Sequence, residues 1–401
     1  MKPTLAVLHH FYYPDDVVSA RLFQDLCEDL SGLGWAVEVW PSNRSCRKRD
    51  QKYSAFESHK NVQVNRVWRP NLQQESSFGR IFNSIWMITA WFFKFVFYPG
   101  KRPQVILIST DPVLGLLTAI GVRAVDSKVK IAHWCFDLYP EAAVADKKLK
   151  ENGWTNRFLS WLMGKAYCAC DVIVDLGVCM KKKLSQYPSR AIHETLTPWA
   201  FYEPAQVQSA NISERKKLFD DASLGILYSG NFGLAHTADL AGQLARELVQ
   251  DGVRFCFSIR GHAKKEFQRK CLMEEWPISF VEFAAEENLN LRLEATDIHM
   301  VSLKADWTGT VVPSKFFGAL AAGRPVLFEG AEDSAIAQWI RAYELGWVLT
   351  LQNFSSVAAS LKNISTNPEK LRKLQEHCLA TYQRLFSRKA MIIQWNKLLL
   401  A

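Results

Sequence analysis

The sequence predicts an α/β protein of two domains, each a parallel sheet with helices on both faces. Its 401 residues exceed the roughly 250–300 at which a single hydrophobic core stops growing. Short apolar runs alternate with helical segments, which is typical of doubly wound sheets. The alternation starts again after a proline-containing stretch near residue 200, so we expect domains at residues 1–200 and from residue 201 onward. The content of 48% hydrophobic and 22% charged residues excludes a disordered chain.

The first half opens with a strand, a loop and a helix. Residues 4–8 are a short apolar run of the kind found in buried parallel strands. Residues 20–30 place Leu22, Phe23, Leu26 and Leu30 on one helical face. The same criteria predict further strands at residues 35–40, 62–68, 105–109, 129–133 and 171–176.

The second half repeats this logic without repeating the sequence. Apolar runs predict strands at residues 224–228, 255–260, 280–283, 298–302 and 326–328. Helices are predicted at residues 237–250 and 316–322, the second closed by Gly323. The chain ends in a long helical stretch, residues 368–400.

Residues 81–98 stand apart because they carry one charge, Lys94, and eight aromatic side chains. As a helix the segment would be about 27 Å long. Predicted strands of one sheet precede and follow it, which argues against a membrane-spanning helix. Two interpretations remain: a buried aromatic helix, or a helix that contacts a membrane interface through Trp86, Trp91, Phe92 and Phe95.

The net charge of 49 − 40 = +9 favours an anionic partner, either a phosphate-bearing ligand or an anionic membrane surface. Nucleic acid is not expected, because no nucleic-acid-binding motif accompanies the charge. Residues 44–52 contain five basic residues, interpreted as a solvated loop or a phospholipid contact.

The nine scattered cysteines predict reduced, mostly buried thiols, and residues 5–8 are too short an apolar run for a signal peptide. We therefore expect a cytoplasmic protein.

Two segments of the second half have the character of anion sites. Residues 228–233 place Gly230, Asn231 and Gly233 between a strand and a helix, where backbone N–H groups can approach an anion closely. In residues 312–326, Pro313 and Ser314 suit a helix start, and Lys315 follows in the first turn. A lysine there opposes the helix dipole unless an anion lies between them. The alternatives are a plain tight turn and a surface lysine.

In the first half, His133, Asp137 and Glu141 follow a predicted strand, at the edge where open α/β sheets bind ligands. We predict that they face a ligand; the alternative is that Asp137 caps a helix and His133 is a core residue. Several common signatures are absent from the sequence. It has no dinucleotide-binding glycine motif after the first strand, no P-loop and no nucleophile elbow. It also has no Asp-x-Asp, the usual metal-binding signature of single-domain glycosyltransferases.

The order of these motifs resembles glycosyltransferase family 4. The resemblance rests on residues 11–14, Asp-Leu-Tyr-Pro-Glu at 137–141, Pro-Trp at 198–199, Gly-Asn-Phe-Gly at 230–233 and residues 313–325. It covers nearly the whole chain and is nearest to the capsule and O-antigen branch, called WbuB-like. The resemblance implies a GT-B fold: two Rossmann-like domains facing a cleft, with an acceptor domain at 1–200, a donor domain at 201–375 and a helix at 376–401 crossing back to the first domain.

The resemblance also implies roles for individual residues. Gly230, Asn231, Gly233, Ser314 and Lys315 would hold the donor diphosphate, with Arg260 a further phosphate contact. His133 and Asp137 would stand near the reacting sugar, with Glu141 supporting them. Such enzymes retain anomeric configuration and use a nucleotide sugar, here expected to be UDP-linked, with no metal or other cofactor.

Two departures bear on the donor and acceptor sites. Thr310 and Gly318 occupy the positions of two glutamates that many family members carry, the second of which grips the nucleotide ribose. Val17 and Val18 replace a common glycine pair in the first loop. Together with the aromatic segment and the net charge, the resemblance implies a hexosyl- or N-acetylhexosaminyltransferase acting on a saccharide or lipid-linked saccharide for cell-surface polysaccharide, peripheral on the inner face of the membrane. The alternatives are a sugar-nucleotide 2-epimerase and a non-catalytic partner in a polysaccharide assembly complex.

Overall fold

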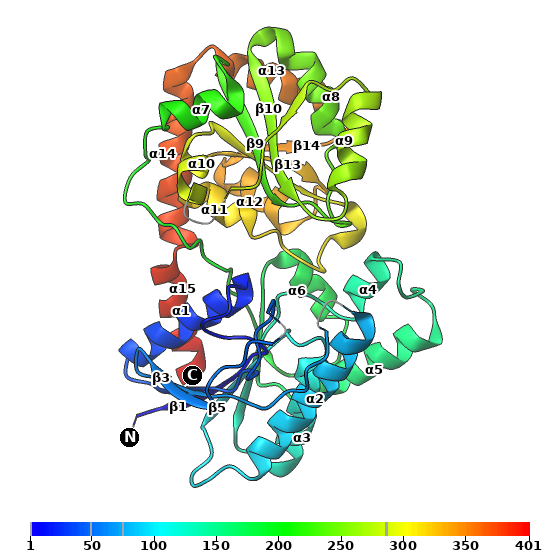
Figure 1. Ribbon diagram of the computed structural model, residues 1–401, viewed down its shortest axis with the longest axis vertical. Helices are drawn as coiled ribbons and strands as arrows, with labels where there is room; N and C mark the ends of the chain where they lie inside the picture. The colour runs from blue at the N-terminus through cyan, green and yellow to red at the C-terminus, as the bar shows by residue number, and fades with distance from the viewer. Residues whose placement is uncertain (1, 49, 74–75, 285–287) are drawn as a thin grey trace. The chain divides into compact units, whose positions relative to one another are not determined.

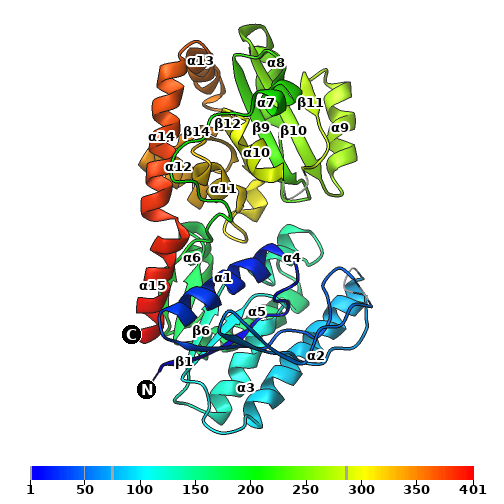
Figure 2. The same ribbon diagram turned by 60° about the vertical axis from the view of Figure 1, so that its left-hand side comes forward.

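The computed structural model describes residues 2–48, 50–73, 76–284 and 288–401, and it confirms the predicted α/β class. The chain divides into two compact units. The first is Met1–Thr197 with Ile392–Ala401, and the second is Pro198–Met391. Each unit contains one largely parallel sheet with helices on both of its faces (Figure 1; Figure 2).

The first sheet has the strand order β3-β4-β2-β1-β5-β6-β7-β8, and its pairs are parallel except β3 with β4. The central strand β5 is buried along its whole length, as expected where helices cover both faces. The sequence did not predict β3 and β8, the two edge strands, because their half-exposed residues form no apolar run. The strands are β1 (Thr4–Leu8), β2 (Ala36–Val39), β3 (Phe56–His59), β4 (Val62–Asn65), β5 (Val105–Ser109), β6 (Lys130–Trp134), β7 (Val172–Asp175) and β8 (Ile192–Thr195).

Two neighbouring residues of β6 show how the helices divide between the faces of this sheet. The His133 ring lies 6.1 Å from that of Tyr167 on α5, whereas Trp134 packs against Phe23 of α1 and Trp395 of α15. Successive strand residues point to opposite faces, so α5 covers one face, and α1 and α15 cover the other. Helix α3 contacts both α2 and α5, which makes these three helices one layer. The helices are α1 (Val18–Gly32), α2 (Ser77–Val96), α3 (Thr118–Val125), α4 (Glu141–Ala145), α5 (Trp154–Cys168), α6 (Val178–Leu184) and α15 (Arg388–Leu400), with the short 3-10 turn η1 (Gly115–Leu117) before α3.

The second sheet has the strand order β11-β10-β9-β12-β13-β14 and parallel pairing throughout. The predicted strand at residues 280–283 is wrong in position, because pairing with β10 begins at Ile278 and ends at Phe280. The strands are β9 (Leu224–Asn231), β10 (Val253–Arg260), β11 (Ile278–Phe280), β12 (Ile298–Leu303), β13 (Val326–Gly330) and β14 (Gly346–Leu349). The helices are α7 (Ile212–Phe219), α8 (Asp239–Leu248), α9 (Lys264–Met273), α10 (Leu289–Glu294), α11 (Lys315–Ala321), α12 (Ala335–Tyr343), α13 (Phe354–Ser365) and α14 (Pro368–Leu385).

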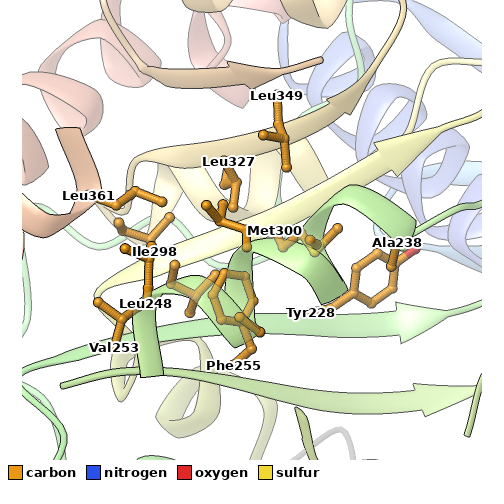
Figure 3. Packing of buried hydrophobic residues seen from close by; sticks show 14 of the residues in the cluster. Tyr228, Ala238, Leu248, Val253, Phe255, Ile298, Met300, Leu327, Leu349 and Leu361 are labelled. Carbon is orange, nitrogen blue, oxygen red and sulfur yellow. The ribbon is translucent and has the colours of Figure 1, made fainter. Parts of the chain in front are cut away.

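The main core of the second unit lies between this sheet and helices α8, α9 and α13. Tyr228, Phe255 and Met300 from three neighbouring strands meet Leu248 of α8 there (Figure 3). The Tyr228 ring also stacks on that of Phe257, with centroids 5.2 Å apart. This packing fixes the end of β9 and therefore the start of the loop that follows it.

The predicted helical stretch at residues 368–400 is two helices, since α14 ends at Leu385 and α15 begins at Arg388. Phe386, between them, packs its ring against Phe317 of α11 and Trp339 of α12. Helix α14 packs on α11 and belongs to the second unit. The segment that groups with the first unit therefore begins at Ile392 rather than at the predicted residue 376.

Helix α2 contains the predicted aromatic segment, and the structure corrects two of its four proposed membrane contacts. Trp91 and Phe95 are fully buried, and Trp91 Nε1 donates a hydrogen bond to the Trp40 carbonyl oxygen at 2.7 Å. Neither side chain is available to a membrane. Trp86 is partly exposed and Phe92 is half-buried. No helix in the described part of the chain is both long and apolar enough to cross a bilayer.

The structure also places the cysteines and the basic loop. All nine cysteines are free thiols and most of them are buried, while Cys168 is exposed. Of the basic cluster, Arg44 is buried and its Nε donates to the Arg69 carbonyl oxygen at 2.8 Å, so it is not part of a solvated loop. Arg49 lies outside the described residues.

We predict that Trp395→Ala lowers the free energy of unfolding by about 3–5 kcal/mol, because its fully buried ring packs 5.0 Å from that of Trp134. Ile393→Ala, in the same helix but 60% exposed, should change it by less than about 0.5 kcal/mol. Urea unfolding followed by far-UV circular dichroism measures both variants. Equal effects would show that the tryptophan contact does not hold α15 in place.

Candidate functional site

The second unit brings Lys315 onto the loop that follows β9. Lys315 Nζ donates to the carbonyl oxygen of Asn231 at 2.8 Å and lies 3.2 Å from Tyr228 Oη and 3.4 Å from His236 Nε2. Among the described residues no carboxylate lies within ion-pair distance of Nζ. Burial lowers the pKa of Lys315 to about 7. The result is a partly buried amine with neutral partners, which we call the Lys315 cluster (Tyr228, Asn231, His236 and Lys315).

Gly230 permits this close approach. Its φ of +132° lies in the region that favours glycine, and a Cβ atom there would collide with the Lys315 side chain. The sequence placed Gly230 in an anion-binding turn. The structure adds that the glycine also makes room for the lysine.

The hydrogen bonds of the Lys315 cluster match a neutral lysine. His236 Nδ1 accepts from the Gly233 N–H at 3.1 Å, and burial lowers the pKa of His236 to about 3. A neutral imidazole that accepts at Nδ1 carries its proton on Nε2. A neutral amine has two N–H groups, for Asn231 and Tyr228, and one lone pair for the His236 N–H. A bound anion would raise the pKa of Lys315, which would then take up a proton from solvent. The Lys315 ammonium group and the His236 N–H could both donate to the anion.

The other predicted phosphate contacts lie on the same edge of the second sheet. Arg260 ends β10 in register with Asn231, and its guanidinium lies 4.4 Å from the centroid of the Phe283 ring. Gly233 is buried and its N–H is already bonded to His236. Ser314 is the exposed N-cap residue of α11 and its side chain makes no capping hydrogen bond. Gly230, Asn231 and Lys315 thus meet directly, and Arg260 and Ser314 adjoin them through strand pairing and chain order.

The start of α8 is already occupied by a carboxylate from the chain itself. Glu329, at the end of β13, accepts hydrogen bonds from the N–H groups of Leu240 and Ala241 at 3.2 and 3.0 Å. Burial raises the pKa of Glu329 to about 7. An anion at this edge would consequently meet Lys315 and the β9 loop rather than the N-terminus of α8.

The two positions that depart from the family glutamates differ in their surroundings. Thr310 is fully buried, and its hydroxyl donates to the Trp307 carbonyl oxygen at 2.7 Å. Gly318 lies in α11, and a Cβ atom built on it would meet nothing within 4 Å. Thr310 is therefore part of the packing, while Gly318, on the same helix as Lys315, borders open space.

The three predicted site residues of the first unit differ in their contacts. His133 is buried and its Nδ1 donates to the Ile108 carbonyl oxygen at 2.8 Å, and burial lowers its pKa to about 4. These contacts favour the core alternative for His133. Glu141 starts α4 and accepts a hydrogen bond from the Tyr187 hydroxyl. Helix α4 has Pro140 at its N-cap and no side-chain capping bond, so Asp137 is not its cap.

Asp137 lies in a group of titratable side chains at the carboxyl edge of the first sheet. Burial, followed by the charge of Asp111, raises the pKa of Asp137 to about 6. Asp111 lies 3.5 Å from His10 Nδ1, and although burial opposes it, this histidine holds the pKa of Asp111 below its ordinary value. A carboxyl group that titrates near neutrality is suited to proton transfer.

Sequence reasoning missed His10, Asp111 and His236. The first two directly follow predicted strands at residues 4–8 and 105–109, so their place at a carboxyl edge was a usable signal. Nothing in the sequence indicated that His10 and Asp111 approach each other, because residues about one hundred apart in the chain meet only through the pairing of β1 with β5. His236 lies in a loop whose course no sequence pattern indicated.

One surface pocket of the second unit lies away from the predicted site residues. This pocket, of about 590 Å³, is lined by residues including Trp347, Asn353 and Ser360, and by none of the predicted site residues. Within the described ranges, no group of three His, Cys, Asp or Glu side chains is arranged to hold a metal ion.

Comparison with known sequences found one named relative and no matching family model. The relative is the probable glycosyltransferase WbjE of Pseudomonas aeruginosa, 26% identical over 266 residues. The aligned part covers 62% of this chain and 62% of that protein, which is less than two thirds of each.

Comparison with solved structures shows the fold over the whole chain. Sucrose-phosphate synthase (tll1590) from Thermosynechococcus elongatus matches with a TM-score of 0.71 at 13% identity, covering 99% of this chain and 98% of that one. HepE (Alr3699) of Anabaena, in complex with UDP and glucose, matches with a TM-score of 0.64 at 11% identity, covering 98% of each chain. The chain therefore has the GT-B fold, two Rossmann-like parallel-sheet domains.

We predict opposite effects on stability for two glycine substitutions of the site. Gly230→Ala should lower the free energy of unfolding by about 1–3 kcal/mol, because φ is +132° and the new methyl group displaces Lys315. Gly318→Ala should raise it by about 0.5–1 kcal/mol, because the helix gains propensity and nothing is displaced. Urea unfolding of both variants measures this; a neutral Gly230→Ala would mean that Lys315 does not need the space.

Proposed function

We propose that this protein is a glycosyltransferase that moves a hexosyl or N-acetylhexosaminyl unit from a UDP-linked donor to a saccharide or lipid-linked saccharide. We assign it to the WbuB-like branch of family 4 and to cell-surface polysaccharide synthesis, with retention of configuration and without a metal ion. The proposal draws on the motif order and on the partial relative named a probable glycosyltransferase. It is supported by the fold shared with HepE, whose structure contains UDP and glucose.

The observation that carries the proposal is the Lys315 cluster. Several other cations at low exposure are ion-paired, such as Arg292 with Glu214 and Arg66 with Glu57, while the buried Arg44 and Arg324 donate to backbone carbonyl oxygens. Lys315 instead faces neutral groups, and its desolvation has no compensating carboxylate among the described residues. A diphosphate would provide that compensation. The cluster is therefore suited to a ligand that brings its own negative charge.

In the proposed reaction the second unit stabilises the leaving group. As the bond between the sugar and the diphosphate breaks, negative charge grows on the diphosphate oxygens. Lys315, which is protonated when the ligand binds, stabilises this negative charge. Arg260 and the His236 N–H add further donors. We assign Asp137, with its pKa raised to about 6, to the reacting sugar and Glu141 to its support. His133, bonded to the backbone, acts as a positioning residue beneath them.

We place the protein on the cytoplasmic face of the membrane, where lipid-linked acceptors would be reached. The exposed aromatic residues of α2, among them Trp86, support this part of the proposal.

Nucleotide binding is the first experiment. Thermal unfolding of the full chain in EDTA is measured with UDP, GDP, CMP and ADP, since a ligand of the folded state raises its stability by about 2.7 kcal/mol at a hundred times Kd. A shift with UDP supports the donor site and its independence of metal. No shift with any nucleotide favours the non-catalytic partner. Conversion of the donor sugar without an acceptor would identify the epimerase.

We predict that Lys315→Ala lowers turnover by on the order of a hundredfold or more, the effect of losing a main charge-stabilising donor. Because Lys315 makes no ion pair among the described residues, the variant should keep its thermal unfolding midpoint in the absence of ligand. Lys217→Ala, an exposed lysine on α7, is the matched control and should be fully active. Full activity of Lys315→Ala would contradict the assignment of Lys315 to the diphosphate.

We also predict that UDP binding takes up a proton above pH 7. The pKa of Lys315 is lowered to about 7 in the free protein, and the bound diphosphate raises it again. Affinity should thus be highest below pH 7 and fall towards tenfold per pH unit above it. Calorimetry at pH 8 in two buffers of different ionisation enthalpy measures the uptake. Wild type should show it and Lys315→Ala should not; uptake retained by the variant would assign the proton elsewhere.

A further inference from the structure

We propose that helices α2 and α5 of the first unit form one membrane-binding face, with the aromatic side chains of α5 as its second anchor. We call this the aromatic face: Trp154, Phe158 and Trp161 of α5 together with the exposed residues Phe78, Ile81, Phe82 and Ile85 of α2. Its occupant is the headgroup region of an anionic lipid bilayer. The inference rests on the membrane location given under the proposed function and names the residues that produce it.

Helix α5 exposes the side chains that a surface helix normally buries. Trp154, Phe158 and Trp161 are 80%, 53% and 58% exposed, and their spacing of four and then three residues puts them on one side of the helix. The inward side of α5 carries the buried residues Met163 and Tyr167. An amphipathic surface helix shows polar residues on its outer side. Here large aromatic residues take that place, which is typical of a helix lying in a membrane interface.

The topology puts the α2 and α5 residues at the same end of one layer. Each helix links two parallel strands, so each begins at the carboxyl edge of the first sheet and runs back towards the amino edge. The α2 residues of the aromatic face lie in the first half of that helix, although Phe93 is also exposed further along it, and those of α5 lie between its start and its midpoint. Helix α3 and η1 lie between them and contact both (Figure 1; Figure 2). The two sets therefore belong to one continuous surface rather than to opposite sides of the unit.

The charges of this layer match an anionic surface. The sequences of α2, α3 and α5 contain five basic residues and no aspartate or glutamate: Arg80, Lys94, Arg123, Arg157 and Lys165. Arg123 is paired with Asp171 and Lys94 donates to the Asn65 carbonyl oxygen, so Arg157 and Lys165, next to the exposed aromatic residues of α5, carry the match. Lys165 Nζ lies 5.9 Å from the centroid of the Trp161 ring, which pairs a cation with an interfacial aromatic residue. A basic residue close to an anionic membrane is attracted to it. A second copy of this chain would bring like charges together, so the charge pattern favours lipid over self-association.

The test compares full-length variants in vesicle co-sedimentation. Trp154→Ser, Phe158→Ser and Trp161→Ser are combined in one variant. The matched control combines Ile212→Ser, Leu272→Ser and Met273→Ser, three equally exposed apolar residues of the second unit. Vesicles are phosphatidylcholine alone or with about one third phosphatidylglycerol, at low and at high salt. UDP-induced thermal stabilisation without vesicles is measured in parallel, since it depends only on the donor site.

The wild type and the control should bind the anionic vesicles and lose affinity at high salt. The α5 variant should bind at least tenfold more weakly, while its stabilisation by UDP is unchanged. Anionic-vesicle binding that the α5 variant keeps would overturn the proposal, as would a wild type that does not bind. A wild type that is a dimer without lipid, with an α5 variant that is a monomer, would also overturn the proposal, because the partner of this face would then be a second copy of the chain. Vesicle binding without any UDP response would contradict the donor site alone.

Discussion

Parallel strand pairing is the constraint on which the rest of this structure depends. Two parallel neighbours cannot be joined by a tight turn, so nearly every strand is followed by a helix that returns the chain to the opposite edge. The loops after the strands then gather at one edge of each sheet. Lys315's partners on the β9 loop, Arg260 after β10, and the Asp111 and Asp137 group of the first unit all lie at such an edge. The same rule gives α2 and α5 a common starting edge and so aligns their aromatic residues.

Electrostatics divides the carboxyl edge of the second sheet into a closed part and an open part. Glu329 satisfies the first N–H groups of α8 from within the chain. Lys315 has only dipoles for partners, and its charge depends on what binds beside it. An anion therefore finds the first N–H groups of α8 already bonded, whereas Lys315 can gain a proton when an anion binds beside it. This edge of the sheet thus has one preferred point of attachment for an anion, next to Lys315.

The fold was predictable from sequence wherever burial was complete. Residues 4–8 and 105–109 were placed with both ends correct, because a strand covered on both faces reads as an unbroken apolar run. The short edge strands β3 and β8 have no such run. Lys315 was identified because a cation at a helix start is locally anomalous. His236, and the meeting of His10 with Asp111, depend on chain segments that only the tertiary structure brings together. The aromatic segment misled for a related reason: a helix apolar on all sides does not indicate its inner face, so Trp91 and Phe95 were assigned to the surface although the core holds them.

Gly318 has a consequence for how such a protein can change. Most positions beside a ligand site are constrained by packing, so a new side chain there is selected against before it can be useful. At Gly318 a Cβ atom meets nothing within 4 Å, and the backbone is already helical. An alanine there would displace nothing and would lie one turn along the same helix from Lys315. Single substitutions can therefore arise at this position without a cost in folding, which makes it a point of evolvability in an otherwise closely packed unit.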